Sequence, residues 1–151
     1  MGDLAVRSTI PAMSQAAIDT VRRAEDYSLA HLPQRPITTE HVFHAGLYAR
    51  TILIPQHVLL TGALIKIATL LIVDGHALVY VGEEEPFEIR GHAVLPASAG
   101  RKQVFHAQAD TWLTMVFATA ARTVADAERA FTDEYEKLFS RRNAETIVMG
   151  E

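Results

Sequence analysis

The chain has 151 residues, of which 49% are hydrophobic and 21% are charged, and these values are typical of one globular domain with its own core. The net charge is −4 and there is no basic block, so nucleic-acid binding has no electrostatic support. The absence of cysteine excludes disulfide bonds and thiolate chemistry.

The first 40 residues predict a helix followed by an extended arm. Residues 1–10 carry charges and no long apolar segment, so we expect no secretory signal there. From Ile10 to Leu32 there is no glycine, and apolar residues recur three and four positions apart, which favours a helix. Pro33 and Pro36 end that pattern and predict the arm.

The middle of the chain, residues 41–119, is predicted to form strands, because short apolar runs alternate with glycine and proline. Asp74-Gly75 predicts a hairpin turn. The apolar stretch Val58–Val73 is interpreted as two strands divided at Gly62. It is shorter than the roughly 20 residues of a membrane span and it contains Lys66, so we expect no membrane segment there.

The last part, residues 120–151, predicts a helix and a short tail. The helix is expected from Arg122 to Ser140, and the tail from Asn143 to Glu151. One face of this helix carries apolar residues at spacings of three and four: Val124, Ala127, Phe131, Tyr135 and Leu138.

Five pieces of the middle region, in this order, carry a resemblance to a known family. They are Gly46-Leu47-Tyr48-Ala49-Arg50, Leu60-Thr61-Gly62, Gly75, Pro96 with Gly100-Arg101-Lys102, and Asp110-Thr111-Trp112-Leu113-Thr114. Together they resemble the small cupin-like jelly-roll proteins encoded among the structural genes of tailed bacteriophages. The resemblance covers about half of the chain and implies a mainly β, cupin-like jelly-roll barrel or sandwich, here with an N-terminal and a C-terminal helix.

The metal ligands of many cupin-like relatives have no counterpart here. The resemblance places Lys66 and Ala68 at the two histidine positions, Ile72 and Val73 at the glutamate, and leaves only His106 for the second motif. A metal site needs three or four donor side chains, and neither a lysine ammonium nor alanine is one. We therefore expect no metal, no cofactor, no catalytic residue and no enzymatic activity.

Other polar residues leave alternatives open. His41 and His44 are spaced like metal ligands, but on a strand they face opposite sides, so we interpret them as solvated or hydrogen-bonded. Distant histidines could still be brought together by a barrel. The Lys66 ammonium could point outward or fill the vacated metal pocket. The run from Glu83 to Glu85 is expected to be a solvated turn.

An interface with a second copy or with a capsid is expected at five apolar residues: Phe131, Tyr135, Phe139, Ile18 and Val21. The alternative is that the stripe of the C-terminal helix covers its own barrel. Because jelly rolls often pair sheet to sheet, we expect a homodimer with two-fold contacts.

The resemblance implies a non-enzymatic structural protein, a bacteriophage capsid cement or decoration protein that clamps major capsid protein subunits as a homodimer. We expect it in the virion, on the capsid exterior, and in the host cytoplasm during assembly, with no nucleic-acid or membrane partner. One alternative is a cupin that binds a small molecule or metal at a degenerate site. Another is a helper of virion assembly that is absent from the mature particle.

Overall fold

The computed structural model of the chain describes residues 9–82, 85–138 and 145–150. Its first element is helix α1, Gln15–His31. The helix begins at Gln15 and not at Ile10, because the Ser14 hydroxyl caps it by accepting a hydrogen bond from the Ala17 N–H at 3.1 Å. It ends at His31, before Pro33, as the sequence predicts.

The described strands form one sheet of eight strands in which neighbours are antiparallel, except for β8 beside β1. Its path is β3-β6-β4-β7-β2-β1-β8, and β5 pairs with β4. The strands are β1 (Thr39–His44), β2 (Leu47–Ile54), β3 (Leu59–Thr61), β4 (Thr69–Tyr80), β5 (Phe87–Ala97), β6 (Val104–Ala107), β7 (Thr111–Ala118) and β8 (Glu145–Met149).

The prediction that Asp74-Gly75 forms a hairpin turn is wrong. Both residues lie within β4, which pairs with β5 along its whole middle part. On its other side β4 pairs first with β7 and then with β6, and Gly75 lies where these partners change. A Cβ atom at Gly75 would come within 2.6 Å of Thr111 Oγ1, and its φ is +149°. The glycine is there because another strand approaches closely, not because the chain turns.

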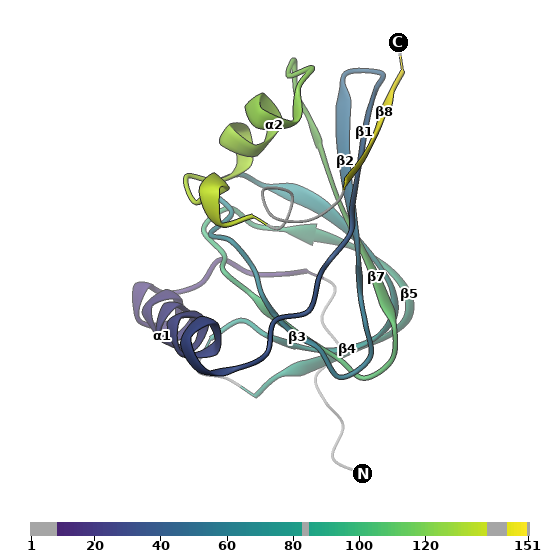
Figure 1. Cartoon of the computed structure of the whole chain (residues 1–151). Helices are drawn as coiled ribbons and strands as arrows, with labels where there is room; N and C mark the ends of the chain where they lie inside the picture. Colours follow the sequence, from purple (N-terminus) through teal and green to yellow (C-terminus); the bar gives the residue numbers. More distant parts are fainter. Residues whose placement is uncertain (1–8, 83–84, 139–144, 151) are drawn as a thin grey trace.

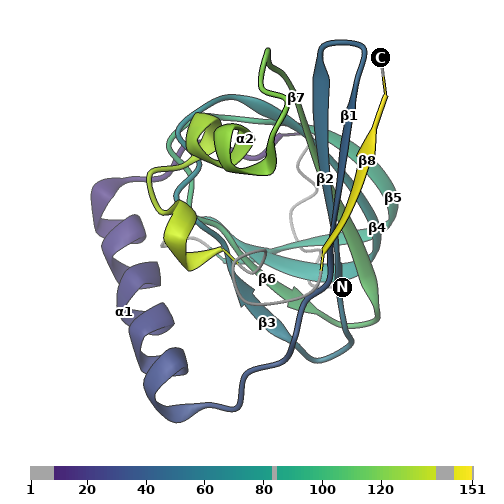
Figure 2. The same ribbon diagram turned by 45° about the horizontal axis from the view of Figure 1, so that its top comes forward.

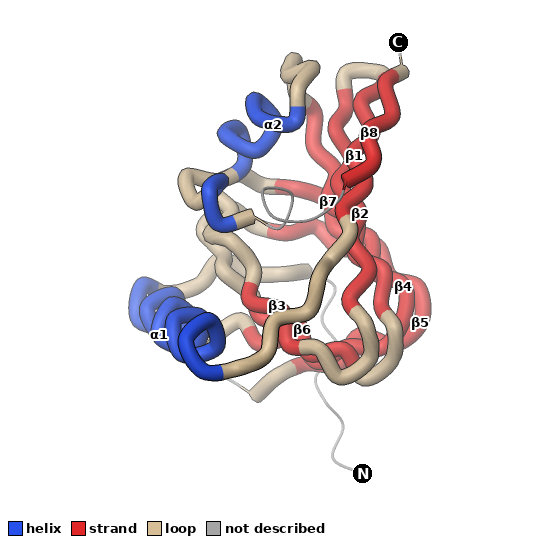
Figure 3. The backbone as a smooth tube through the Cα atoms, viewed as in Figure 1, coloured by secondary structure: helices blue, strands red, loops and turns tan. Residues whose placement is uncertain are grey.

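The sheet curls into a partly closed barrel with α1 beside it (Figure 1). In most strands alternate residues point inward and form the core, as in β7, where Leu113, Met115 and Phe117 are buried, whereas the edge strand β8 is exposed. Figure 2 looks toward the open end of the curl, where the second helix lies across it. The tube view separates these helices from the strands (Figure 3). The predicted class, mainly β with an N-terminal and a C-terminal helix, is confirmed.

The C-terminal helix is shorter than predicted. Helix α2 spans Val124–Phe131, and a short 3₁₀ helix, η1, follows at Tyr135–Lys137. The helix ends because Thr132 turns into the body of the protein, where its hydroxyl donates to the Leu64 carbonyl at 2.7 Å. The Lys66 N–H donates to the Phe131 carbonyl at 2.8 Å, so contacts with the loop between β3 and β4 replace helical ones.

Part of the expected tail, Glu145–Met149, forms a strand. Its β-branched residues Thr146, Ile147 and Val148 lie in β8, which adds a parallel edge to β1. Among the described residues, no helix is both long enough and apolar enough to cross a membrane.

Candidate functional site

A cavity of about 110 Å³ lies inside the curl, between the sheet, α2 and η1. Most of its wall is apolar, and the central contacts come from Leu71, Phe105, Leu113, Met115 and Phe131. Strands β4, β6 and β7 supply the first four, and the last residue of α2 supplies the fifth. An apolar wall with a few polar groups is typical of small-ligand sites, but this cavity is smaller than the roughly 300–1,000 Å³ that such sites usually have.

One residue of the cavity wall carries a buried amide. Gln103, just before β6, is 6% exposed, and its side chain shares the inward face with Phe105 two residues later. Its Oε1 atom has no hydrogen-bond partner among the described residues. Gly62 passes close to this residue, since a Cβ at Gly62 would lie 3.1 Å from the Gln103 carbonyl oxygen.

One residue of the cavity wall, Arg50, belongs to a buried ion pair. Arg50 of β2 donates from Nη1 to Glu128 Oε2 of α2 at 3.0 Å, and both residues are buried. The Arg50 guanidinium also lies 5.6 Å from the centre of the Phe131 ring. The charge of Arg50 is therefore neutralised by a carboxylate of α2.

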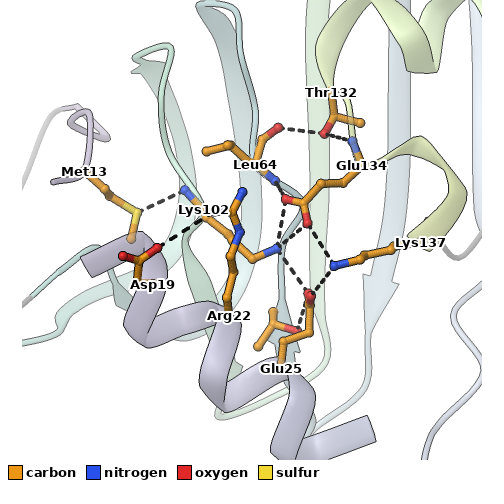
Figure 4. A network of polar contacts seen from close by, with 10 residues as sticks. Met13, Asp19, Arg22, Glu25, Leu64, Lys102, Thr132, Glu134 and Lys137 are labelled. Carbon is orange, nitrogen blue, oxygen red and sulfur yellow. Dashed lines mark hydrogen bonds and ion pairs between the residues drawn. The ribbon is translucent and has the colours of Figure 1, made fainter. Parts of the chain in front are cut away.

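Four charged residues, which we call the rim network, join α1, the sheet and η1 beside the cavity: Glu25, Lys102, Glu134 and Lys137. Lys102 is fully buried, and its ammonium lies 3.2 Å from Glu25 Oε2 and 3.1 Å from Glu134 Oε2. Lys137 reaches the same two carboxylates at 3.5 and 3.4 Å. The close-up shows both ammonium groups between the two carboxylates (Figure 4). Two positive and two negative charges leave the network neutral.

The surroundings shift the pKa values of two groups in the rim network, Glu134 and Lys137. Burial by itself raises the pKa of the Glu134 carboxyl, but the Leu64 N–H and the Lys102 ammonium outweigh it and hold that pKa below its usual value. Burial by itself lowers the pKa of Lys137, but the charges of Glu25 and Glu134 outweigh it and raise that pKa. Both shifts keep Glu134 and Lys137 ionised at neutral pH.

The positions that would bind metal in cupin relatives do not form a metal site. Lys66 is partly exposed, and its ammonium pairs with Asp133 at 2.8 Å, so it does not fill the cavity. Ala68 has no donor atom. His106 neighbours Phe105 in β6, so its side chain points away from the interior. No group of three or more His, Asp or Glu side chains in the described parts of the chain is placed to hold a metal.

The paired histidines face opposite sides, as predicted. His41 is fully buried, with Nδ1 2.6 Å from the Tyr48 hydroxyl, whereas His44 is exposed. His76 pairs with Glu88 at 3.1 Å on the sheet. Glu83 and Glu84 lie outside the described residues, so the predicted solvated turn is not seen.

The residues expected at an interface are mostly inside the chain. Ile18, Val21 and Phe131 are buried, and Phe131 lies against Phe117 with ring centres 6.1 Å apart. Tyr135 is partly buried under the Arg129 guanidinium, and Phe139 lies outside the described residues. The apolar face of α2 therefore covers the chain's own barrel at Phe131, and the exposed apolar side chains lie on other elements. Whether any of the five contacts a partner stays a prediction.

Sequence reasoning did not find the cavity amide or the rim network. The alternation of Arg101, Gln103 and Phe105 could have placed the amide on the inner face with the phenylalanine. The partners of Lys102 lie 77 and 32 positions away, and no local pattern connects them.

No protein-family model matches the chain, and no curated protein matches its sequence. Among solved structures, a cupin family protein with a double-stranded β-helix fold from Methanocaldococcus jannaschii is similar, with 12% identity and a TM-score of 0.47 over 57% of this chain and 83% of that one. A cupin superfamily protein from Desulfitobacterium hafniense has 10% identity and a TM-score of 0.47 over 76% and 99%. A cupin 2 conserved barrel domain protein from Salinispora arenicola has 13% identity and a TM-score of 0.46 over 67% and 92%.

Identities and TM-scores this low support no inference about activity, ligand or partner. None of these three structures is described as a bacteriophage protein, so the resemblance to phage proteins rests on the sequence alone.

We expect the purified chain to carry no stoichiometric metal, because the donor side chains are missing from the cupin positions. Native mass spectrometry should give the mass of the polypeptide alone, and EDTA should leave the midpoint of thermal unfolding unchanged. A metal at one equivalent, lost together with stability on chelation, would contradict this prediction.

Proposed function

We propose that the chain is a non-enzymatic structural protein, a bacteriophage capsid cement or decoration protein that pairs with a second copy and clamps major capsid protein subunits. The observation that carries the pairing is an apolar outer face on the sheet. Its most exposed large side chains, from β2, β4, β5 and β7, are Leu47, Leu70, Val94 and Trp112, each 40–52% exposed. Contiguous exposed apolar surface of this kind marks interaction sites.

Strand pairing makes this face continuous. Leu70 lies opposite Val116, Ile72 lies opposite Val94, and Trp112 lies opposite Leu53. Paired residues share a face of the sheet, so these side chains form one surface across four strands. The same surface on a second copy would meet it about a two-fold axis, with Trp112 as an aromatic anchor.

A second surface is available for the capsid shell in this proposal. A groove of about 500 Å³ runs between α1, the arm and β3, and Leu29, Leu32 and Leu59 line it. All three are about half exposed. Because the groove and the outer face come from different strands, one copy could use both at once. Repetition over a shell would make such attachment multivalent.

Trp112→Glu is expected to convert a dimer into a monomer, because it replaces the aromatic anchor of this face with a charge. Native mass spectrometry or light scattering after gel filtration measures the mass. Tyr27→Glu on α1, whose parent residue is 60% exposed, is the matched control and should stay dimeric. A monomeric wild-type chain, or a Trp112→Glu chain that stays dimeric, would contradict pairing through this face.

The capsid role is tested by peptide mass spectrometry of purified virions from a phage that encodes the chain. We expect the chain in mature particles, and we expect Leu32→Glu to reduce the amount bound without changing dimer mass. Finding the chain only in immature particles would favour an assembly helper. Its absence from all particles would overturn the proposal.

A further inference from the structure

We infer that the groove between α1, the arm and β3 binds an extended, uncharged segment of a partner protein, which adds to the sheet as a strand beside β3. The inference deepens the role of this groove in the proposed function, and it rests on that proposal only for the source of the segment, the capsid protein. Three observations support it: the free edge of β3, the apolar wall of the groove and the balance of charges around it.

Strand β3 has one edge that no other described strand occupies. It forms one end of the sheet path and pairs only with β6. The Val58 carbonyl and the Gly62 N–H both bond to the segment 103–107 at 3.0 Å, so the even-numbered residues here bond toward β6. Because neighbouring residues of an antiparallel strand direct their backbone groups to opposite edges, those of Leu59 and Thr61 point away from β6.

The backbone groups on this free edge select an extended partner. Leu59 and Thr61 both line the groove, and among the described residues no backbone group outside β6 bonds to either of them. A row of unpaired N–H and C=O groups is a template for one more strand. An α-helix uses its own backbone groups internally and could not satisfy this row.

The apolar wall determines the side chains of the segment. Leu59 lines the groove together with Leu29 and Leu32 of α1, and each of the three is 48% exposed. Paired residues of neighbouring strands share a face, so every second residue of an added strand would contact these leucines. Apolar side chains at alternate positions would remove this surface from water. Since β3 spans three residues, or roughly 10 Å, a segment of about three to five residues would cover its edge.

The charges in the groove favour a segment without charge. Apart from His57, its titratable residues are two acidic ones, Glu25 and Glu136, and two basic ones, Arg35 and Lys137. Lys137 is already paired with Glu25 at 3.5 Å. A charged segment would be attracted by one sign and repelled by the other, whereas an uncharged one has no such conflict.

The test is titration of the wild-type chain with a pool of end-blocked, uncharged heptapeptides that have Val, Leu or Phe at every second position and Thr or Ser between them. Amide hydrogen exchange followed by NMR reports the edge of β3. We expect at least one peptide to bind saturably and to slow exchange about tenfold or more at Leu59 and Thr61. Exchange at Leu60 should change little, because its N–H already bonds toward β6.

Two changes separate backbone pairing from side-chain contact. The same peptide with N-methylated backbone amides keeps its side chains and should bind at least about tenfold more weakly, because it loses its donors. Leu59→Pro removes one donor of the free edge, where proline is tolerated, so it should fold and lose a similar factor. Leu59→Ala keeps that N–H and should lose less than Leu59→Pro.

Each contrary outcome has a definite meaning. No saturable binding by any peptide of the pool would overturn the inference. Equal slowing at Leu59, Leu60 and Thr61, or equal binding of the N-methylated peptide, would overturn strand addition in favour of side-chain docking. Slowing that depends on protein concentration without peptide would assign the groove to a second copy. Absence of the chain from virions would overturn the capsid role and leave the peptide result unchanged.

Discussion

Replacing Lys102 with methionine is expected to destabilise the protein by about 3–5 kcal/mol at neutral pH. The substitution leaves a side chain of similar length but removes the fully buried cation between Glu25 and Glu134, whose side chains are only 11% and 12% exposed. Two carboxylates would then face each other with only the partly exposed Lys137 between them. Urea unfolding followed by circular dichroism measures the change.

The matched control is Lys66→Met, which makes the same chemical change at an exposed pair. Lys66 and its partner Asp133 are 42% and 88% exposed, so solvent screens their attraction and the loss should be below about 1 kcal/mol. If both variants lost equal stability, burial of the rim network would not explain the effect. Lys102→Met combined with Glu134→Gln should recover part of the loss, which keeps the test informative if the single variant does not fold.

The rim network also makes the free energy of unfolding of the wild-type chain sensitive to acid. The pKa of the Glu134 carboxyl is lower in the folded chain than its usual 4.5, so the unfolded chain binds the proton more readily. The stabilising contribution of Glu134 is therefore complete above about pH 4.5 and is lost as the pH falls through the folded-state pKa. We expect the stability difference between the wild type and Lys102→Met to narrow over that range, and urea unfolding at several pH values would show it. A constant difference would contradict this linkage.

Local signals in the sequence predicted elements whose causes are local. Pro33 marked the end of α1, Gly62 marked the division between β3 and β4, and strand alternation placed His41 inside and His44 outside. In each case the signal is either a restriction on the backbone or the alternation of side chains along a strand. The tertiary contacts favour the same local structure.

Elements that depend on distant partners were predicted wrongly. Asp74-Gly75 has the composition of a turn, but the glycine is needed because Thr111 passes directly against β4. The apolar stripe after Phe131 continues with helical spacing, but Thr132 and Glu134 bond to Leu64 and end α2. A pattern read along one segment contains no information about a strand or loop that is some 35 or 70 residues away.

The candidate site could likewise be predicted only where it depends on residue types at given positions in the sequence. The loss of metal ligands at Lys66 and Ala68 could be seen in the sequence, because it needs only residue types at given positions. The cavity could not be predicted, because its amide and its charged rim come from α1, from the segment just before β6 and from residues at and before η1. Only the curl of the sheet brings these segments together.

Phe131→Ala is expected to cost about 3–5 kcal/mol of the free energy of unfolding. The ring is 1% exposed, lies edge-on to Phe117 and packs under the Arg50 guanidinium, so its removal enlarges the cavity and exposes the Arg50–Glu128 pair to a void. Chemical denaturation at several protein concentrations measures the loss.

The dependence on concentration decides between the two interpretations of the α2 stripe. If Phe131 is a core residue, the loss is the same at every concentration, because it arises within one chain. If Phe131 is an interface residue, the variant should dissociate a dimer while the isolated chain keeps its stability. Tyr135→Ala is the comparison, since Tyr135 is only partly buried and contacts Arg129 at the surface, and we expect it to cost about 1 kcal/mol or less. A concentration-independent loss at Phe131 together with a dimer that Trp112→Glu breaks would place the stripe in the core and the pairing surface on the opposite side of the sheet.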